Sequence, residues 1–332
     1  PQLFKQLLMI AGFERYYQIA RCFRDEDLRG FRQPEFTQLD IEMSFIAEED
    51  VIALMERVMT GVFAATGFSA PAAPWPRMKY ADAMLRYGND KPDTRFAMEI
   101  VDVGPLVAGC DFKVFQSVLD GGGVVRAFNA GARDFTRSEL DGLNEVVQRH
   151  GAKATAPMPV VEDPGAGAAG GSGEAGSSDL RGGAAAFGGG DGAATAGRSG
   201  EAGSSDLRGG AAALGGVFGG NLAKFFSADQ QAAVIAALDA APGDTLFFVA
   251  DAEPVACAAL GALRLELGRR FGLIEDGRHD LLWIVDPPLL EATGDSAHPW
   301  TAIHHPFTAP IGDLDGDPGA LGSRGYDLVL DG

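Results

Sequence analysis

The amino-acid sequence predicts an α+β fold, in which an antiparallel-sheet core is interrupted by a second α+β unit. Strand-forming patterns occur near both ends of the chain, at residues 16–23, 36–45, 282–285 and 326–330. The residues between about 96 and 277 follow a different order of helices and strands, and residues 164–220 among them are rich in glycine and alanine. We therefore predict a first core part (1–95), an insertion (96–277) and a second core part (278–332).

The first core part begins with a helix. Residues 2–10 carry apolar side chains at helical spacing, and Gly12 ends the pattern. The two strands that follow are joined by a polar loop of unusual length, residues 24–34. An amphipathic helix at residues 48–65 and a second short strand near residues 78–84 complete this part.

The insertion combines helices and strands in the manner of an independent α+β unit. We expect strands at residues 96–101 and 245–250, and helices at residues 137–150, 228–240 and 254–271.

The glycine- and alanine-rich segment contains a duplication, in which residues 173–187 recur as residues 200–214 with one change. Between residues 164 and 216 the large apolar side chains are Leu180, Phe187, Leu207 and Leu214. Burying all four would yield roughly 6–12 kcal/mol. Ordering the backbone costs at least ~1 kcal/mol for each residue, which is several times more in total. We therefore predict that residues 164–220 are disordered rather than a solenoid, because two copies with so few apolar residues form no core.

The composition restricts the kind of protein. The formal net charge of the 332 residues is −19 at pH 7, so the surface as a whole repels polyanions and a nucleotide or RNA must bind at a local site. Three cysteines lie far apart without a Cys-x-x-Cys pair, which favours a reducing compartment. No apolar run approaches a membrane span, so we expect no membrane partner. The chain begins without Met and stops after a strand, so we expect both ends to be cut.

The chemically informative segment is residues 16–42, two strands joined by a loop that carries both signs of charge. A solvated hairpin with surface ion pairs is the simplest interpretation of the charges alone. Their placement favours another interpretation, because Arg24 and Glu26 stand where the first strand ends. On the next strand follow Gln33, Phe36, Gln38 and Asp40. A planar guanidinium suits phosphate, and an aromatic ring offers a stacking face, so the segment is a candidate nucleotide site.

At this point a family resemblance becomes visible. Residues 23–26 with residues 32–38 (Phe-Arg-Asp-Glu and Arg-Gln-Pro-Glu-Phe-Thr-Gln) resemble motif 2 of the class II aminoacyl-tRNA synthetases in its aspartate-specific form. Further pieces resemble other segments of the family, in the family's order. Residues 1–9 resemble the segment after motif 1, residues 91–96 the junction into the bacterial-type GAD insertion, and residues 260–268 the last helix of that insertion. Residues 303–310 and 326–330 resemble two parts of the core that resumes after the insertion. The resemblance implies a partial class II core with a GAD-like insertion.

The resemblance also implies the nucleotide site. Arg24 would bind the ATP α-phosphate and stabilise charge during adenylate formation, and Glu26 would share the catalytic role. Glu26 and Gln33 would contact the nucleotide, and Phe36 would stack on adenine. Asp327 matches an acid near the Mg²⁺ that accompanies ATP. Taken alone, Phe36 could be a core residue of a strand, and Asp327 could cap one.

The aspartate site is implied in the same way. Gln2, Lys5 and Asp40 match positions around the amino acid, with Lys5 pairing its side-chain carboxylate and Asp40 its ammonium group. His304 and His305 match a loop that closes over the substrate. Taken alone, Lys5 could be a solvent lysine, and the histidines could be zinc ligands, although no cysteine or acidic cluster accompanies them.

The function implied is aspartate–tRNA ligation: ATP-dependent formation of aspartyl-adenylate, followed by transfer to the tRNA acceptor end. A homodimer in the full-length parent is implied as well, in the bacterial cytoplasm or in an organelle matrix. The rival functions are an asparagine synthetase-like enzyme that uses aspartyl-adenylate without tRNA, a non-catalytic GAD-bearing amidotransferase subunit, and a degraded paralogue.

Departures from the family pattern support the last rival. Phe31 stands where the family has an acid, Pro287 where an aromatic residue is usual, and Asp331 where Asn is usual. We find no motif 1, motif 3 or anticodon-binding barrel, so we expect this chain alone to be inactive.

Overall fold

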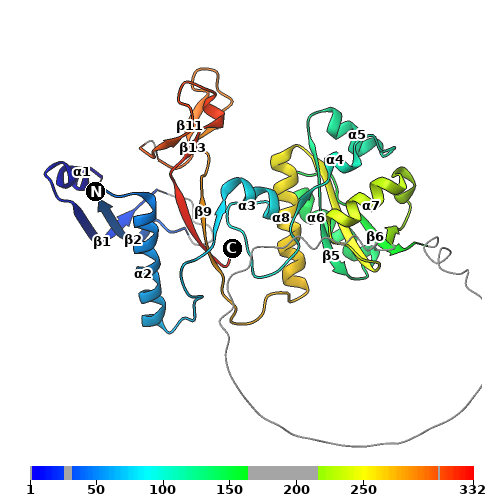
Figure 1. Ribbon diagram of the computed structural model, residues 1–332, viewed down its shortest axis with the longest axis horizontal. Coiled ribbons are helices and arrows are strands. Elements are labelled where there is room, and N and C mark those ends of the chain that lie inside the picture. The colour runs from blue at the N-terminus through cyan, green and yellow to red at the C-terminus, as the bar shows by residue number, and fades with distance from the viewer. Residues whose placement is uncertain (1, 26–31, 164–215, 306) are drawn as a thin grey trace, which may run out of the picture. The chain divides into compact units, whose positions relative to one another are not determined.

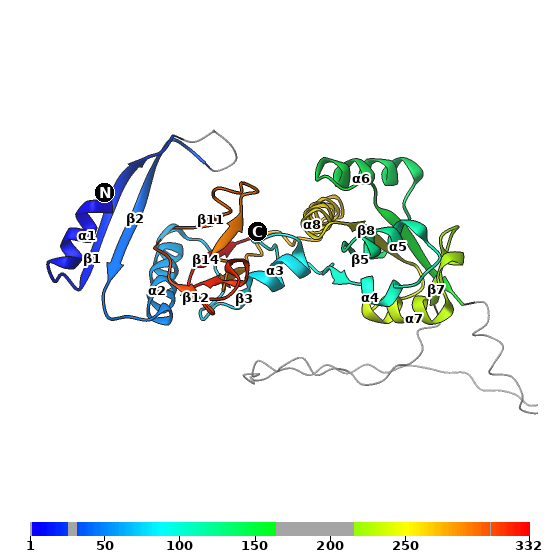
Figure 2. The same cartoon turned by 90° about the horizontal axis from the view of Figure 1, so that it is seen from above.

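The computed structural model describes residues 2–25, 32–163, 216–305 and 307–332. The chain forms two compact units (Figures 1 and 2). Unit 1 comprises Pro1–Ala83, Asp90–Arg95 and Ile274–Gly332, and unit 2 comprises Met84–Asn89 and Phe96–Leu273. The chain thus leaves unit 1 briefly at residues 84–89 and again for the long segment 96–273, and returns to unit 1 each time.

Unit 1 contains short sheets and one long helix. Its elements are α1 (Gln2–Ile10), β1 (Arg15–Phe23), β2 (Glu35–Met43), α2 (Glu48–Thr66), β3 (Arg77–Lys79), β9 (Leu281–Val285), β10 (Leu290–Ala292), β11 (Trp300–Ala302), β12 (Pro310–Ile311), η3 (Pro318–Ala320), β13 (Gly322–Ser323) and β14 (Tyr326–Leu330). Strands β1 and β2 form an antiparallel hairpin, while β14, β9 and β3 form a second sheet. Pairing is antiparallel except between β3 and β9, which run parallel.

The expected second strand near residues 78–84 is wrong beyond Lys79. Helix α3 (Tyr80–Tyr87) takes over there, with Asp82 in its first turn and Arg86 in its last. These charges complement the helix dipole, and the residues between them are good helix formers.

A buried carboxylate joins the core of unit 1. Ile52 and Phe63 of α2 pack with Trp75 and with Trp283 of β9. Glu56, on the same helix, accepts hydrogen bonds from the Trp75 amide (3.0 Å) and from Nε1 of Trp283 (3.1 Å). The bonds satisfy a charge that would otherwise be buried without partners.

Unit 2 is built on a five-stranded antiparallel sheet. Its elements are β4 (Val101–Asp102), α4 (Gly104–Val107), α5 (Lys113–Asp120), β5 (Val124–Ala132), α6 (Arg137–Arg149), β6 (Ala156–Glu162), β7 (Gly216–Phe218), η2 (Ala223–Phe225), α7 (Ala228–Ala237), β8 (Asp244–Asp251) and α8 (Glu253–Arg270). The strand order is β4-β5-β8-β6-β7.

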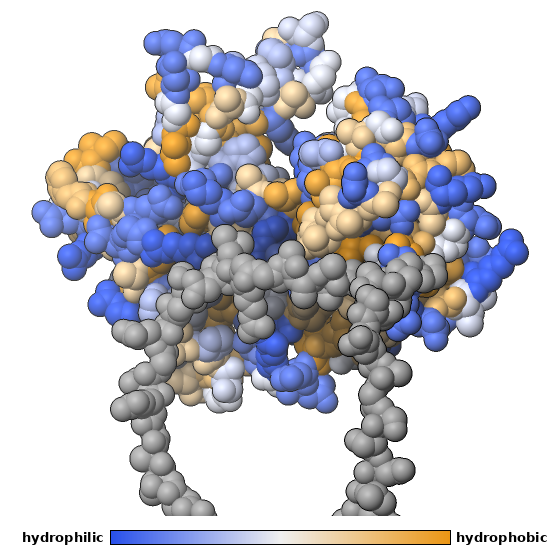
Figure 3. Space-filling model, turned by 45° about the vertical axis from the view of Figure 1, so that its right-hand side comes forward, coloured by the Kyte–Doolittle hydropathy of each residue, from blue (hydrophilic) through white to orange (hydrophobic). Residues whose placement is uncertain are grey.

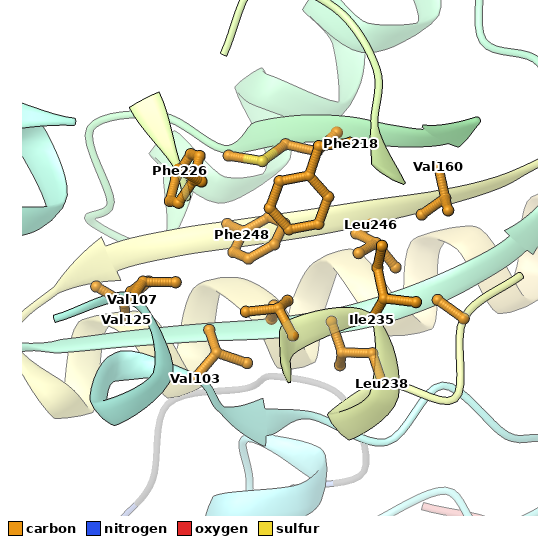
Figure 4. Close-up of a cluster of buried hydrophobic side chains, with 14 of the residues drawn as sticks. Val103, Val107, Val125, Val160, Phe218, Phe226, Ile235, Leu238, Leu246 and Phe248 are labelled. Atoms are coloured by element: carbon orange, nitrogen blue, oxygen red, sulfur yellow. The ribbon is translucent and has the colours of Figure 1, made fainter. Parts of the chain in front are cut away.

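Helices cover both faces of this sheet. Phe248 and Val125 point to one face, where Val107 of α4 and Ile235 of α7 complete an apolar core (Figure 4). Because side chains alternate along a strand, their neighbours point to the opposite face, where α8 packs against β5 and β8 and α6 packs against α8.

Two predictions for this unit need correction. The strand expected at residues 96–101 is wrong, because the guanidinium of Arg264 donates hydrogen bonds to the carbonyls of Phe96, Ala97 and Met98, and a strand begins only at Val101. The segment expected to be disordered extends too far, because residues 216–218 form β7 and Phe218 is 3% exposed. The remainder of that prediction, residues 164–215, lies outside the described residues, as do Glu26 and Phe31.

An ionic cluster in unit 1 holds together the two segments that flank the long part of unit 2, residues 96–273. Nη2 of Arg95 lies 2.8 Å from Oδ2 of Asp93, and Nη1 lies 3.5 Å from Asp331. Nδ1 of His279 lies 2.7 Å from the same Asp331 carboxylate. Thr94 donates a hydrogen bond of 3.2 Å to Asp280. Residues 90–95 and 274–280 are therefore fastened to each other and to the end of β14.

Apolar side chains are exposed at several places on the surface (Figure 3). Helix α1 is the clearest case, since Leu3, Phe4, Leu7 and Ile10 are 64%, 72%, 53% and 82% exposed. Among the described residues, no helix is long and apolar enough to cross a membrane.

Candidate functional site

The β1–β2 hairpin places its polar side chains by strand alternation. Its antiparallel register sets Cys22 opposite Phe36 and Gln18 opposite Asp40. The Arg24 amide extends the pairing by one residue, with a 2.9 Å bond to the Pro34 carbonyl. Since opposed residues share a face, Arg24, Phe36 and Asp40 lie on the same side of the hairpin.

Helix α1 brings a lysine to this hairpin. Nζ of Lys5 lies 3.0 Å from Oδ1 of Asp40 and 2.7 Å from Oε1 of Glu42. The Lys5 side chain is 17% exposed and that of Asp40 is 20% exposed, so the ion pair is shielded from solvent. Burial lowers the pKa of Lys5, but the hydrogen bonds and negative charges of Glu42 and Asp40 outweigh burial and raise the pKa above its usual value. The ammonium form is therefore retained at neutral pH.

A cavity of about 470 Å³ opens beside this ion pair. Its lining residues are Gln2, Lys5, Arg21, Cys22, Phe23, Arg24, Gln38 and Asp40. The cavity contains cations from α1 and β1, an acid on β2, and neutral amides that can donate and accept hydrogen bonds. Such a lining matches a small ligand that carries an ammonium group and more than one negative charge.

Arg24 and Phe36 form a pair at the end of the hairpin. The guanidinium carbon of Arg24 lies 5.1 Å from the centre of the Phe36 ring, within the range of a cation–π contact. Arg24 is exposed and Phe36 is half-buried. Both groups stand on the cavity face of the hairpin, although Phe36 does not line the cavity itself.

The predicted loop histidines take different positions. Nε2 of His304 lies 3.5 Å from Oδ2 of Asp327, which is on β14. His305 lines a neighbouring cavity of about 510 Å³ together with Gln2 and Glu42. Gln2 thus borders both cavities, and His305 lies on the side of α1 near the Lys5 ion pair.

A metal site of protein ligands alone does not fit these residues. Among the described residues, no group of three or more His, Cys, Asp or Glu side chains could hold an ion. Asp327 provides one exposed carboxylate. That arrangement suits Mg²⁺ only where a ligand's own oxygens and water complete the coordination.

Not every predicted residue joins the cavity. Gln33 is exposed on the segment before β2. Glu26 cannot be placed, as noted above. Gln38, expected on the second strand beside Asp40, does line the cavity. Sequence reasoning missed Glu42, although a signal existed: it lies two residues from Asp40 on the same strand, so alternation sets both on one face.

Comparisons with known proteins identify the class of this fold and site. The whole chain, residues 1–332, matches the family described as tRNA synthetases class II (D, K and N), so the chain belongs to that family. It is similar to the aspartate--tRNA(Asp/Asn) ligases of Bacillus cereus (strain B4264), Bacillus anthracis (strain A0248) and Bacillus thuringiensis (strain Al Hakam). Identity to each is 43% over 338 residues, which cover 100% of this chain and 48% of the relative. The chain thus spans about half the length of the curated relatives it matches.

Proposed function

We propose that the protein activates L-aspartate with ATP and transfers the aspartyl group to the acceptor end of a tRNA. Membership of the class II family and the names of the relatives support this activity. The observation that carries the proposal is the shielded ion pair of Lys5 with Asp40 and Glu42, at the border of a polar cavity.

The ion pair matches aspartate in charge. An aspartate that enters the cavity presents its side-chain carboxylate to Lys5 and its ammonium group to Asp40. Each protein charge then exchanges one partner for an equivalent one, so neither is left buried without compensation. Asparagine offers a neutral amide instead, so the Lys5 ammonium gives up the Asp40 carboxylate, gains no second anion and keeps Glu42 alone, which disfavours asparagine relative to aspartate.

The nucleotide lies at the Arg24 end of the same face. In the proposed reaction, the α-carboxylate of aspartate attacks the α-phosphorus of ATP, and pyrophosphate leaves. Arg24 binds the α-phosphate and stabilises the charge that develops there, while Phe36 stacks on the adenine ring. Gln33 and Glu26 contact the nucleotide, and His304 and His305 close over the amino acid. Mg²⁺, held through phosphate oxygens with Asp327 nearby, would neutralise phosphate charge.

Two further parts of the proposal concern architecture. We assign unit 2 to the GAD-like insertion, supported by its position between two parts of unit 1. We also propose that the full-length protein is a homodimer. The exposed apolar side of α1 supports additional contacts for that helix in the complete protein.

ATP–pyrophosphate exchange, measured with the gene's full-length product, tests the proposal. Replacing Arg24 with Ala removes one charge-assisted contact to the transition state, and we expect exchange to fall by roughly 10²–10³. Arg15→Ala is the matched control. Arg15 lies exposed on the same strand, and alternation places it on the opposite face of the hairpin, so its loss should leave exchange unchanged. A change below about threefold for Arg24→Ala would show that Arg24 is only a surface charge.

The choice of acceptor separates the main rival. A ligase charges tRNA with aspartate, whereas an asparagine synthetase-like enzyme converts aspartyl-adenylate and ammonia to asparagine. Charging of tRNA without ammonia-dependent asparagine formation supports the ligase. The reverse result assigns the chain to the rival.

A further inference from the structure

Unit 2 contains a cavity of its own, of about 640 Å³, which the proposed reaction does not use. Its floor is apolar and is built from Phe112 and Phe115 at the start of α5, Leu222, and Phe248 and Ala250 of β8. Phe248 is fully buried in the core beneath (Figure 4). The size lies within the range of ligand sites, and the floor suits one bulky apolar group.

The sheet leaves a strand edge unpaired at this cavity. Strand β6 pairs with β8 from Pro159 opposite Thr245 to Ala156 opposite Phe248, whereas β8 continues to Asp251. Before Ala156 the chain turns away, because the amide of Thr155 donates its hydrogen bond (3.0 Å) to Asn144 of α6 instead. Among the described residues, no strand therefore pairs with the last residues of β8 on that side.

The register shows which backbone groups face the gap. The carbonyl of Phe248 accepts a 3.0 Å hydrogen bond from Oγ1 of Thr155, so the polar groups of Phe248 point toward β6. In an antiparallel ladder every second residue points the same way. The N–H and C=O of Ala250 therefore face the cavity, where they can bind one residue of an extended chain.

Two lysines give the cavity a positive rim. Lys113 of α5 and Lys153 of the segment before β6 both line it, and both are exposed. Asp251 is the one acid in the lining, and its Oδ1 already accepts a 2.9 Å bond from the Ala252 amide. This local excess of positive charge contrasts with the net charge of −19 for the whole chain. It selects an anionic ligand.

We propose that this cavity binds the C-terminus of an extended peptide that ends in a bulky apolar residue. The backbone of Ala250 pairs with the amide group of that last residue, as in the addition of a short strand to a sheet. The apolar side chain packs on Phe112 and Leu222, which are half-buried, and the terminal carboxylate pairs with Lys113 and Lys153. A neutral, amidated C-terminus or a positively charged N-terminus could pair with the strand edge, but neither would bring a negative charge to the two lysines.

Fluorescence anisotropy with labelled pentapeptides tests the proposal. The probe is Gly-Ser-Ala-Val-Phe, labelled at its N-terminus and with a free carboxylate. The controls are its C-terminal amide and the same peptide ending in Gly. We expect saturable binding of the probe, with at least tenfold weaker binding of both controls. Such binding must also exceed that of the labelled dye alone.

Protein variants locate the binding. Lys113→Gln and Lys153→Gln should each weaken binding about tenfold, because each removes one charge-assisted contact. Lys224→Gln, an exposed lysine of the same unit that does not line the cavity, should leave it unchanged. Ala250→Pro removes the facing N–H and should abolish binding while the circular dichroism spectrum is retained. The proposal is overturned if the probe does not bind, if acid and amide bind equally, or if both Lys→Gln variants bind as well as the wild type.

Discussion

Arg264 should be the most important polar side chain for the stability of unit 2. It is 1% exposed, in the middle of α8. Its guanidinium donates bonds of 2.7, 3.0 and 3.1 Å to the carbonyls of Phe96, Ala97 and Met98. The same group lies 3.9 Å from the centre of the Phe96 ring. These contacts hold a segment in which Met98 has a φ of 76°, a conformation that a methionine seldom adopts without support.

The magnitude follows from how many acceptors lose a partner. Replacing Arg264 with Met preserves most of the volume but leaves the carbonyls unbonded. Phe96 and Met98 are buried, whereas Ala97 is exposed, so the Ala97 carbonyl can bond water instead. Two buried acceptors at about 1–1.5 kcal/mol each, with the ring contact at about 0.5–1 kcal/mol, give a loss of about 2.5–4 kcal/mol. Arg264→Lys keeps the charge without the planar fork and should lose about half as much.

Urea unfolding of both variants, followed by circular dichroism, gives the loss in free energy of unfolding. Hydrogen exchange of the amides of residues 96–100 shows whether the loss begins in that segment. Arg269→Met is the control on the same helix, because the Arg269 side chain is 76% exposed, and we expect a change of no more than about 0.5 kcal/mol. A loss below about 1 kcal/mol for Arg264→Met would refute the reasoning.

Three further predictions concern single positions. Gly261→Ala should destabilise unit 2 by about 1–3 kcal/mol, since a Cβ would lie 2.7 Å from the Tyr87 carbonyl oxygen. In α6, a Cβ at Gly142 would lie 4.0 Å from a guanidinium nitrogen of Arg270, an ordinary contact, so Gly142→Ala should stabilise by about 0.5–1 kcal/mol; thermal unfolding measures both. The hydrogen bond from Arg86 lowers the pKa of Glu99 below its ordinary 4.5, so its contribution to stability is present above pH 4.5 and is lost as pH falls through the lower folded-state pKa. Glu99→Gln should therefore remove part of the loss of stability that the protein shows on acidification below pH 4.5, and an unchanged dependence of unfolding on acid pH would contradict this. In the full-length protein, Lys5→Met should raise the KM for aspartate far more than it weakens ATP binding, and unchanged aspartate kinetics would remove Lys5 from the site.

Amphipathic periodicity predicted some elements closely. Helix α2 was expected at residues 48–65 and lies at Glu48–Thr66, and β1 and β2 begin within one residue of their expected positions. Each of these elements presents the spacing of its own secondary structure in the sequence. Strand β5 was missed because it is buried on both faces, so its side chains do not alternate between apolar and polar.

Other features depend on contacts that local patterns cannot show. The segment that begins at Phe96 has strand-forming residues. It forms no strand, because Arg264, 168 positions after Phe96, donates hydrogen bonds to its carbonyl oxygens. Lys5 and Asp40 lie 35 positions apart, and family resemblance rather than periodicity assigned both to the amino-acid site, whereas their direct ion pair was not predicted. Glu42, which completes that ion pair, was missed because the resemblance assigned it no role.

The ionic cluster formed by Arg95, Asp93, Asp331 and His279 has an evolutionary consequence. It fixes, within unit 1, the two ends of the long segment 96–273, and it uses no residue of unit 2. A unit whose two ends are held together in this way can be enlarged, shortened or exchanged while unit 1, from which it extends, keeps its fold. The duplicated glycine- and alanine-rich segment lies in the sequence between these two ends. Selection on the reaction site therefore exerts little restraint on its length, and related sequences should differ most in size there.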